Sequence, residues 1–186
     1  MADRAGWPIA IVAIHWATAL LALATACYGI YLLSPPEWSQ AYIDRYFAGI
    51  HLHKIGGLAV LGLALCWLAL RAAIPRPPLA ARGGARRFVL GVHGALLGLM
   101  VLLPASGYLM DTLAGNGIAL FGGFEIPSFL RRNDPASVML SYFHKWAGFA
   151  LLGLAALHAA GGLRHLFRPA KGDTARSMLL HGLRRK

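Results

Sequence analysis

Acidic side chains are scarce in this chain. Its 186 residues include seven Asp and Glu against 18 Lys and Arg. The four longest apolar stretches, residues 9–32, 53–74, 88–110 and 140–165, contain no carboxylate at all. Sites for zinc or hard cations, and proton paths through a membrane, normally use carboxylates. This absence argues against a cation site or a proton-coupled transporter inside the apolar stretches.

Cysteine is almost missing too. Cys27 is expected toward the outer end of the first predicted span and Cys66 in the inner half of the second, so they are too far apart to pair. They predict no disulfide framework and are interpreted as small apolar fillers. The first stretch is too long for a cleaved signal peptide and lacks its flanking pattern.

What the chain has in abundance is apolar sequence. Hydrophobic residues make up 58% of it and charged residues 13%, with a mean hydropathy of +0.57. Each of the four stretches reaches the ~20 residues that a helical membrane span needs. We therefore predict an all-α membrane protein, a four-helix transmembrane bundle at residues 1–170, followed by a basic cytoplasmic tail at 171–186. A short interfacial helix is expected at residues 38–47.

The basic residues are concentrated on one side of the predicted bundle. Of the 18 Lys and Arg, 13 fall at the termini or in the connection between the second and third spans, and excess positive charge marks cytoplasmic segments. Both termini are therefore expected in the cytoplasm. The basic residues flank apolar spans, which indicates binding to anionic lipid headgroups rather than to nucleic acid. The 13 are Arg4, Arg71, Arg76, Arg82, Arg86, Arg87, Arg164, Arg168, Lys171, Arg176, Arg184, Arg185 and Lys186.

Histidines stand inside or at the ends of the spans, where an ionisable group is costly unless something binds it. His144 and His158 are 14 residues apart, about 21 Å and close to four helical turns, so they share one helix face near opposite membrane edges. His53 matches the outer depth of His144, and His15 the inner depth of His158. These depths predict two bis-histidine sites, stacked across the membrane.

A porphyrin iron suits such a pair, because two neutral imidazoles fill both axial positions and the apolar macrocycle suits hydrocarbon. The implied activity is electron transfer. Histidines that merely pack, in a haem-free anchor or interaction subunit, remain the alternative of another class, and a metal or proton transporter comes third. His93 has no depth-matched partner and is interpreted as a packing or pocket residue. His165, Arg82 and Arg71 form a candidate site for quinone or a small anion, with headgroup anchoring as the alternative.

Motifs along the whole chain resemble the bacterial cytochrome b561 family, which is related to hydrogenase b-type subunits. The resemblance rests on Ile14-His15-Trp16, on His53-Lys54-Ile55-Gly56-Gly57, on His93 with Pro104 and Ser106-Gly107-Tyr108-Leu109-Met110, on Phe121-Gly122-Gly123-Phe124, and on His144-Lys145-Trp146 with His158.

The resemblance implies two haem b groups held by His15, His53, His144 and His158, in a multi-pass protein of the bacterial inner membrane. It also implies electron exchange between membrane quinone, such as ubiquinone, and a redox partner. A superoxide:ubiquinone oxidoreductase is the alternative. The chain departs from the family at Trp67, where an arginine is common and where Arg71 follows one turn later.

Overall fold

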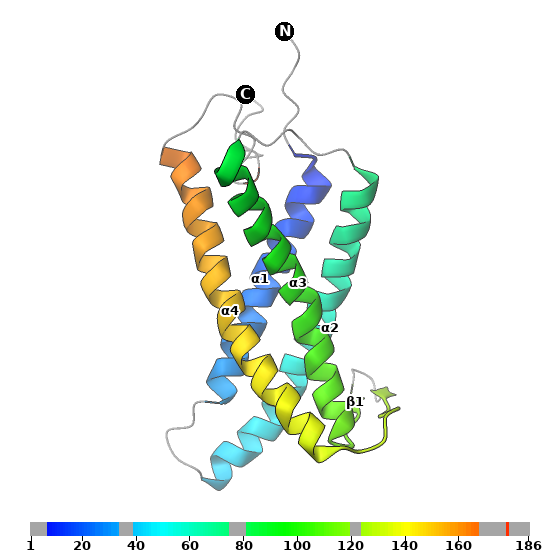
Figure 1. Ribbon diagram of the computed structural model, residues 1–186. Coiled ribbons are helices and arrows are strands. Elements are labelled where there is room, and N and C mark those ends of the chain that lie inside the picture. Colours follow the sequence, from blue (N-terminus) through cyan, green and yellow to red (C-terminus); the bar gives the residue numbers. More distant parts are fainter. Residues whose placement is uncertain (1–6, 34–38, 75–80, 120–123, 168–177, 179–186) are drawn as a thin grey trace.

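Four long helices form the molecule. The computed structural model describes residues 7–33, 39–74, 81–119, 124–167 and 178. The helices run side by side, and each is long and apolar enough to cross a membrane, which confirms the predicted four-helix transmembrane bundle (Figure 1). They are α1 (Ile9–Leu32), α2 (Gln40–Ala73), α3 (Gly83–Leu113) and α4 (Asp134–Phe167).

The two ends of the bundle differ, and we name them by what they carry. The terminal end holds the starts of α1 and α3 and the ends of α2 and α4 (Figure 1). The loop end holds the α1–α2 and α3–α4 connections. The terminal end corresponds to the predicted inner side, and the loop end to the predicted outer side.

Local sequence explains where the helices begin. The carbonyl of Pro8 accepts the first backbone hydrogen bonds of α1, where a proline without its own N–H costs nothing. Ser39 caps α2 by accepting from the Tyr42 amide through Oγ at 3.3 Å. The Tyr42 hydroxyl in turn donates to the Leu32 carbonyl at 2.5 Å, which satisfies an otherwise open acceptor at the end of α1.

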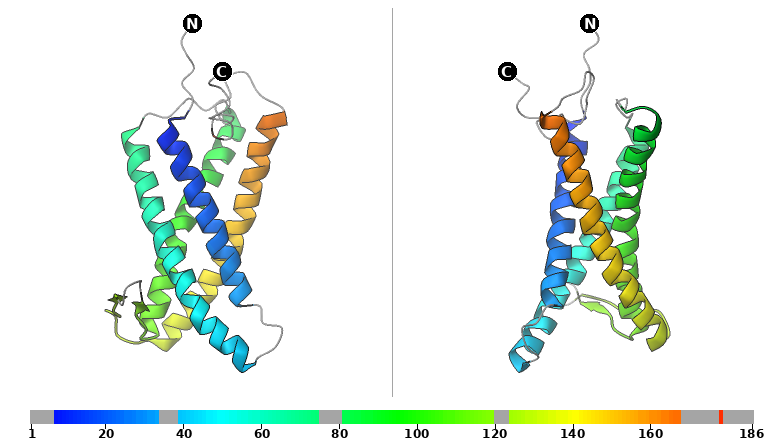
Figure 2. Two further views of the ribbon diagram at one scale, coloured as in Figure 1. Left: turned by 180° about the vertical axis from the view of Figure 1, so that it is seen from behind. Right: turned by 60° about the vertical axis from the view of Figure 1, so that its left-hand side comes forward.

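The sequence prediction made three of the four helices, α2, α3 and α4, shorter than they are. The prediction of a separate interfacial helix at 38–47 is wrong for residues 40–47. These residues form the first part of α2, which runs without interruption from Gln40. No proline lies between Ser39 and His53, so nothing ends the helix before the apolar stretch begins. In Figure 2 this first part of α2 projects beyond the end of α1. Likewise α3 extends to Leu113 and α4 begins at Asp134.

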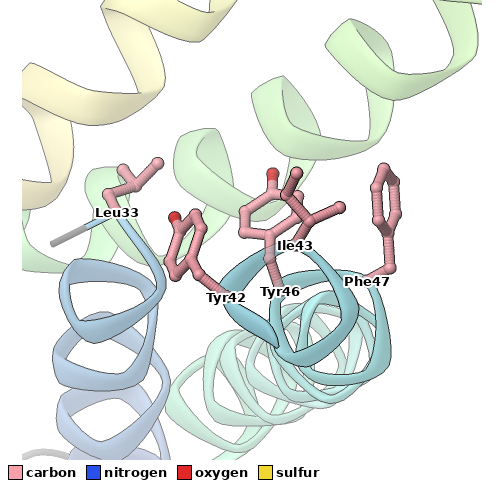
Figure 3. Close-up of a pocket in the computed structure, with 5 residues that line it drawn as sticks. All are labelled: Leu33, Tyr42, Ile43, Tyr46 and Phe47. Carbon is pink, nitrogen blue, oxygen red and sulfur yellow. The ribbon is translucent and has the colours of Figure 1, made fainter. Parts of the chain in front are cut away.

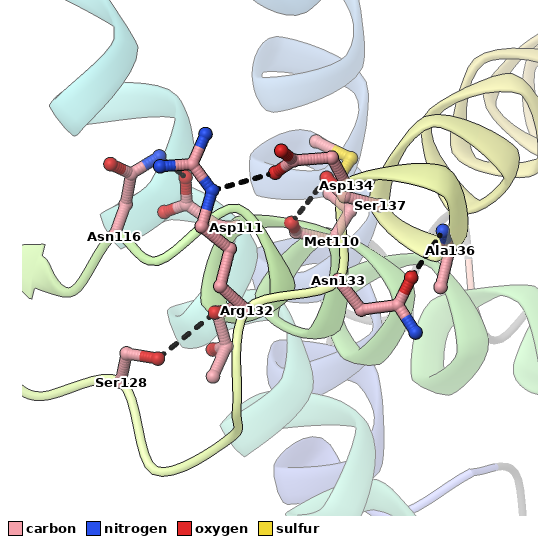
Figure 4. Close-up of polar contacts among 10 residues, drawn as sticks. Met110, Asp111, Asn116, Ser128, Arg132, Asn133, Asp134, Ala136 and Ser137 are labelled. Atoms are coloured by element: carbon pink, nitrogen blue, oxygen red, sulfur yellow. Dashed lines mark hydrogen bonds and ion pairs between the residues drawn. The ribbon is translucent and has the colours of Figure 1, made fainter.

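The α3–α4 connection is held by a small sheet and by side-chain hydrogen bonds. Strands β1 (Ile118–Ala119) and β2 (Glu125–Ile126) pair antiparallel. Ser128 Oγ donates to the Thr112 carbonyl at 2.9 Å, and Ser137 Oγ donates to the Met110 carbonyl at 2.7 Å (Figure 4). Arg132 donates to Asp134 at the surface, and this hydrogen bond raises the pKa of the guanidinium. The connection is therefore folded onto the loop end of α3.

Helix packing in the bundle is uneven. The most extensive contacts join α3 to α4, α1 to α2 and α2 to α3. By contrast, α4 makes few contacts with α1 or α2. A small apolar core, formed by Leu96, Leu103, Ala147 and Leu151, lies between α3 and α4. The faces that α4 turns toward α1 and α2 are thus not closed by helix-to-helix packing.

The predicted basic tail at 171–186 lies outside the described residues except for Met178. The Met178 carbonyl accepts a hydrogen bond from the Trp16 indole at 2.9 Å. The division of the chain at residue 170 stays a prediction.

Candidate cofactor-binding site

One pair of histidines lies toward the loop end. His53 on α2 and His144 on α4 have ring centroids 6.0 Å apart and ring planes at 80°. Nδ1 of His53 lies 3.0 Å from the Thr25 carbonyl, and Nδ1 of His144 lies 3.0 Å from the Leu103 carbonyl. A carbonyl only accepts, so each Nδ1 carries the proton and each Nε2 keeps a free lone pair. Carbonyls that fix the second nitrogen in this way are typical of metal-binding histidines.

Glycines on the neighbouring helices make room for these two rings. A Cβ added at Gly29 would stand 2.7 Å from Cε1 of His53, and one added at Gly107 would stand 3.1 Å from Cε1 of His144. Both distances are shorter than the 3.5–4.0 Å of an ordinary carbon contact. Any larger residue would push the ring away. Ser106 Oγ lies 3.1 Å from His144 Nδ1 and adds a polar contact on the same side.

A second histidine group lies toward the terminal end. His15 on α1 and His158 on α4 have ring centroids 6.0 Å apart, with planes at 67°. His93 on α3, for which the sequence offered no partner, has its ring 4.9 Å from that of His158. The rings of Trp16 and Trp67 flank His15 at 5.5 and 5.8 Å. The structure thus brings three imidazoles together here and two at the loop end.

The ring separations can be compared with what a shared metal would require. An imidazole nitrogen binds a metal at about 2 Å and the ring centre lies about 1 Å further out, so two axial imidazoles have centroids roughly 6 Å apart. The His53–His144 and His15–His158 separations of 6.0 Å both match this value. The 4.9 Å between His93 and His158 is too short for two ligands on opposite sides of one iron.

The surroundings of both pairs also suit a large flat ligand. Each pair joins α4 to a helix that it scarcely contacts otherwise. A Cβ added at Gly57 on α2, or at Gly148 or Gly153 on α4, would meet no other atom within 4 Å. Among the described residues, no group of three or more His, Cys, Asp and Glu side chains could hold a bare metal ion. Two imidazoles on a porphyrin iron fit this donor set, because the porphyrin supplies the other four ligands.

An ion pair lies beside the loop-end histidines. Lys54 Nζ is 2.5 Å from Asp111 Oδ2, and the two side chains are only 19% and 12% exposed. Among the described residues, Lys54 is the partner of this buried oxygen. Asn116 donates to the other carboxylate oxygen at 3.3 Å. This ion pair joins α2 to α3.

The three residues of the candidate quinone or anion site lie at the terminal end. The Arg71 guanidinium carbon stands 5.2 Å from the Trp7 ring centroid and 5.5 Å from that of Trp67, both within cation–π range. Arg82 precedes the first turn of α3 and is exposed, and His165 is half-buried in the last turn of α4. Their joint binding of a quinone stays a prediction.

An apolar pocket of about 350 Å³ lies at the loop end, where α1 ends and α2 begins (Figure 3). The sequence predicted only a short interfacial helix in this region, at residues 38–47. The pocket is lined by Leu33, Tyr42, Ile43, Tyr46 and Phe47.

Several residues of the histidine sites had no clear signal in the sequence. Gly107 belongs to a motif of the resemblance, but nothing marked it as a neighbour of His144. Gly29 gave no signal, because glycine is common wherever membrane helices pack closely. The carbonyls of Thr25 and Leu103 are backbone atoms that every sequence has, so their role depends on helix register and emerges only in three dimensions.

Comparison with known proteins identifies the family of the chain. A family model described as prokaryotic cytochrome b561 matches residues 6–181. Cytochrome b561 homolog 2 of Escherichia coli (strain K12) is 30% identical over 178 residues, which cover 90% of this chain and 87% of that protein. The chain therefore belongs to the prokaryotic cytochrome b561 family, and it is a multi-pass membrane cytochrome that binds b-type haem and transfers electrons.

Proposed function

We propose that this cytochrome holds two haem b groups, one between His15 and His158 and one between His53 and His144, and carries electrons across the bacterial inner membrane to or from quinone. The observation that carries the proposal is the equal 6.0 Å separation of the two histidine pairs, which meet on α4 four turns apart. One cofactor would lie near each edge of the membrane.

Haem b supplies a one-electron iron centre whose potential depends on its axial ligands, burial and hydrogen bonding. The protein's own part is to hold the imidazoles in place. The carbonyls of Thr25 and Leu103 fix the tautomers of His53 and His144, so that both Nε2 atoms would be available as ligands. If His15 and His158 hold one haem iron and His53 and His144 the other, neither iron would have a free site for oxygen, which favours electron transfer over oxygen chemistry.

The charge distribution supports an orientation with the terminal end in the cytoplasm, since 13 of the 18 Lys and Arg belong to it by sequence. A quinone site formed by Arg71, Arg82 and His165 would then lie at the cytoplasmic edge, next to the His15–His158 pair. Cationic and imidazole N–H groups are suitable donors to a quinone carbonyl.

Superoxide oxidation coupled to ubiquinone reduction is the second candidate. By sequence the loop end carries five basic and five acidic residues, so it has no net charge. Two of the basic residues, Lys54 and Arg132, are in ion pairs with Asp111 and Asp134. An anionic substrate would gain little electrostatic steering toward such a surface, so we place this activity second. The five basic residues are Arg45, Lys54, Arg131, Arg132 and Lys145, and the five acidic ones Glu37, Asp44, Asp111, Glu125 and Asp134.

The decisive experiment is a reduced-minus-oxidised optical spectrum of the detergent-purified protein, with a pyridine haemochrome count. We expect two haem b per chain with sharp low-spin bands. A colourless protein would overturn the proposal and favour the haem-free anchor subunit. A single haem would mean that only one of the two pairs is a ligand pair. Quinol oxidation or quinone reduction by the same preparation then tests the quinone assignment.

A further inference from the structure

The two histidine pairs differ in how their rings are held. His53 and His144 each have a backbone carbonyl at Nδ1, whereas neither His15 nor His158 makes a hydrogen bond to any part of the chain that the structure describes. A metal-binding histidine almost always donates its second N–H to a partner that fixes its tautomer and raises its basicity. If His15 and His158 are ligands, as proposed above, the terminal-end site needs such a partner.

His93 is the side chain close enough to His158 to accept a hydrogen bond from its imidazole. Its Nδ1 lies 2.7 Å from the Val89 carbonyl, so Nδ1 carries the proton and Nε2 is a free acceptor. Two imidazoles that share an N–H···N hydrogen bond of about 2.9 Å, with ring centres about 1 Å beyond each nitrogen, have centroids roughly 5 Å apart. The observed separation of His93 and His158 is 4.9 Å.

We propose that His93 is a positioning residue for the terminal-end haem, accepting the Nδ1 proton of His158 on its Nε2 atom. The inference rests on the proposed ligand role of His158. The two rings stand edge to face at 83°, with a centroid separation that matches an N–H···N hydrogen bond between imidazoles. Because α3 and α4 form the most extensive helix contact, the backbone separation of the two residues is well fixed.

A pure packing role for His93 fits the structure less well. The side chain is exposed and lies outside the apolar core between α3 and α4. Its ring contact is with His158. An acceptor on the ligand makes the imidazole a stronger donor to iron, which favours the oxidised state. His93 therefore lowers the potential of the terminal-end haem relative to the same site without it.

The test compares His93→Leu with His93→Gln in the full-length purified protein, by redox titration of both haems. We expect His93→Leu to raise the potential of the terminal-end haem and to weaken its retention about tenfold or more. The potential of the loop-end haem should not move. His93→Gln, whose amide oxygen can accept the same proton, should restore most of both properties. His51→Leu, at an exposed position near the loop end of α2, is the matched control and should change neither haem.

Retention of the loop-end haem reports folding in every variant. An unchanged terminal-end potential in His93→Leu would overturn the inference, and so would equal shifts in the Leu and Gln variants. A different result would refute the proposed function instead, namely a wild-type protein without two haems or a His158→Ala variant that keeps both. The two failures are thus distinguishable.

Discussion

Replacing Gly29 with alanine tests the loop-end site most directly. The added Cβ would stand 2.7 Å from Cε1 of His53. An ordinary carbon contact needs about 3.5–4.0 Å, so the ring must retreat by roughly 1 Å. His53 is hydrogen bonded to the Thr25 carbonyl on the neighbouring helix, which opposes that movement. We expect Gly29→Ala to displace the ring from the 6.0 Å separation that suits a shared iron.

The size of the effect follows from the cost of overpacking. Inserting a methyl group into a filled site typically costs about 1–3 kcal/mol. At about 1.4 kcal/mol per factor of ten, haem binding at the loop end should weaken roughly 5- to 150-fold. Gly107→Ala should act in the same direction but less strongly, since its Cβ would lie 3.1 Å from the His144 ring.

The assay is the haem count and low-spin spectrum of each purified variant, with the terminal-end haem as internal reference. Gly62→Ala is the matched control, because Gly62 is exposed, lies on the face of α2 opposite to His53, and a Cβ there meets nothing within 4 Å. We expect a graded loss, greatest for Gly29, smaller for Gly107 and absent for Gly62. Equal haem content in all three variants would refute the assigned role of these glycines.

Two further predictions concern the ligands and the buried ion pair. His53→Ala and His15→Ala should each remove one haem and leave the other; if either variant lost both haems while still folded, the sites would not be independent. Lys54→Met should leave Asp111 buried without a cation and cost about 3–5 kcal/mol of unfolding free energy. Arg132→Ala breaks an exposed ion pair and should not measurably change thermal unfolding, whereas equal losses in both variants would contradict this account.

The sequence predicted those features that follow from helix geometry alone. The predicted span at residues 9–32 matched α1 at both ends. Pro8 marks the start of the helix, and the end of the apolar stretch marks its last residue. The depth of each histidine follows from a rise of about 1.5 Å per residue, whatever the neighbours are. The separations between His53 and His144, and between His15 and His158, are consistent with that prediction of depth.

Features that depend on how the helices turn toward one another were not predictable. Depth alone left His93 without a partner, and its contact with His158 depends on the rotation of α3 against α4. The Lys54–Asp111 ion pair required α3 to continue beyond the apolar stretch, which ends at Met110. The length of α2 was underestimated because Asp44 and Arg45 interrupt the apolar sequence before His53, whereas the helix continues through them without a proline to end it.

The weak contact of α4 with α1 and α2 has a consequence for how this protein matures. The helices pack as a series, α1 on α2, α2 on α3 and α3 on α4, whereas both proposed ligand pairs join α4 to helices that it scarcely contacts, α1 and α2. A ligand that binds only the assembled state stabilises it by mass action. Because a cofactor in either proposed site would link α4 to α1 or α2, we expect haem to contribute to tertiary assembly and the amount of mature protein to follow haem availability after the helices have been inserted.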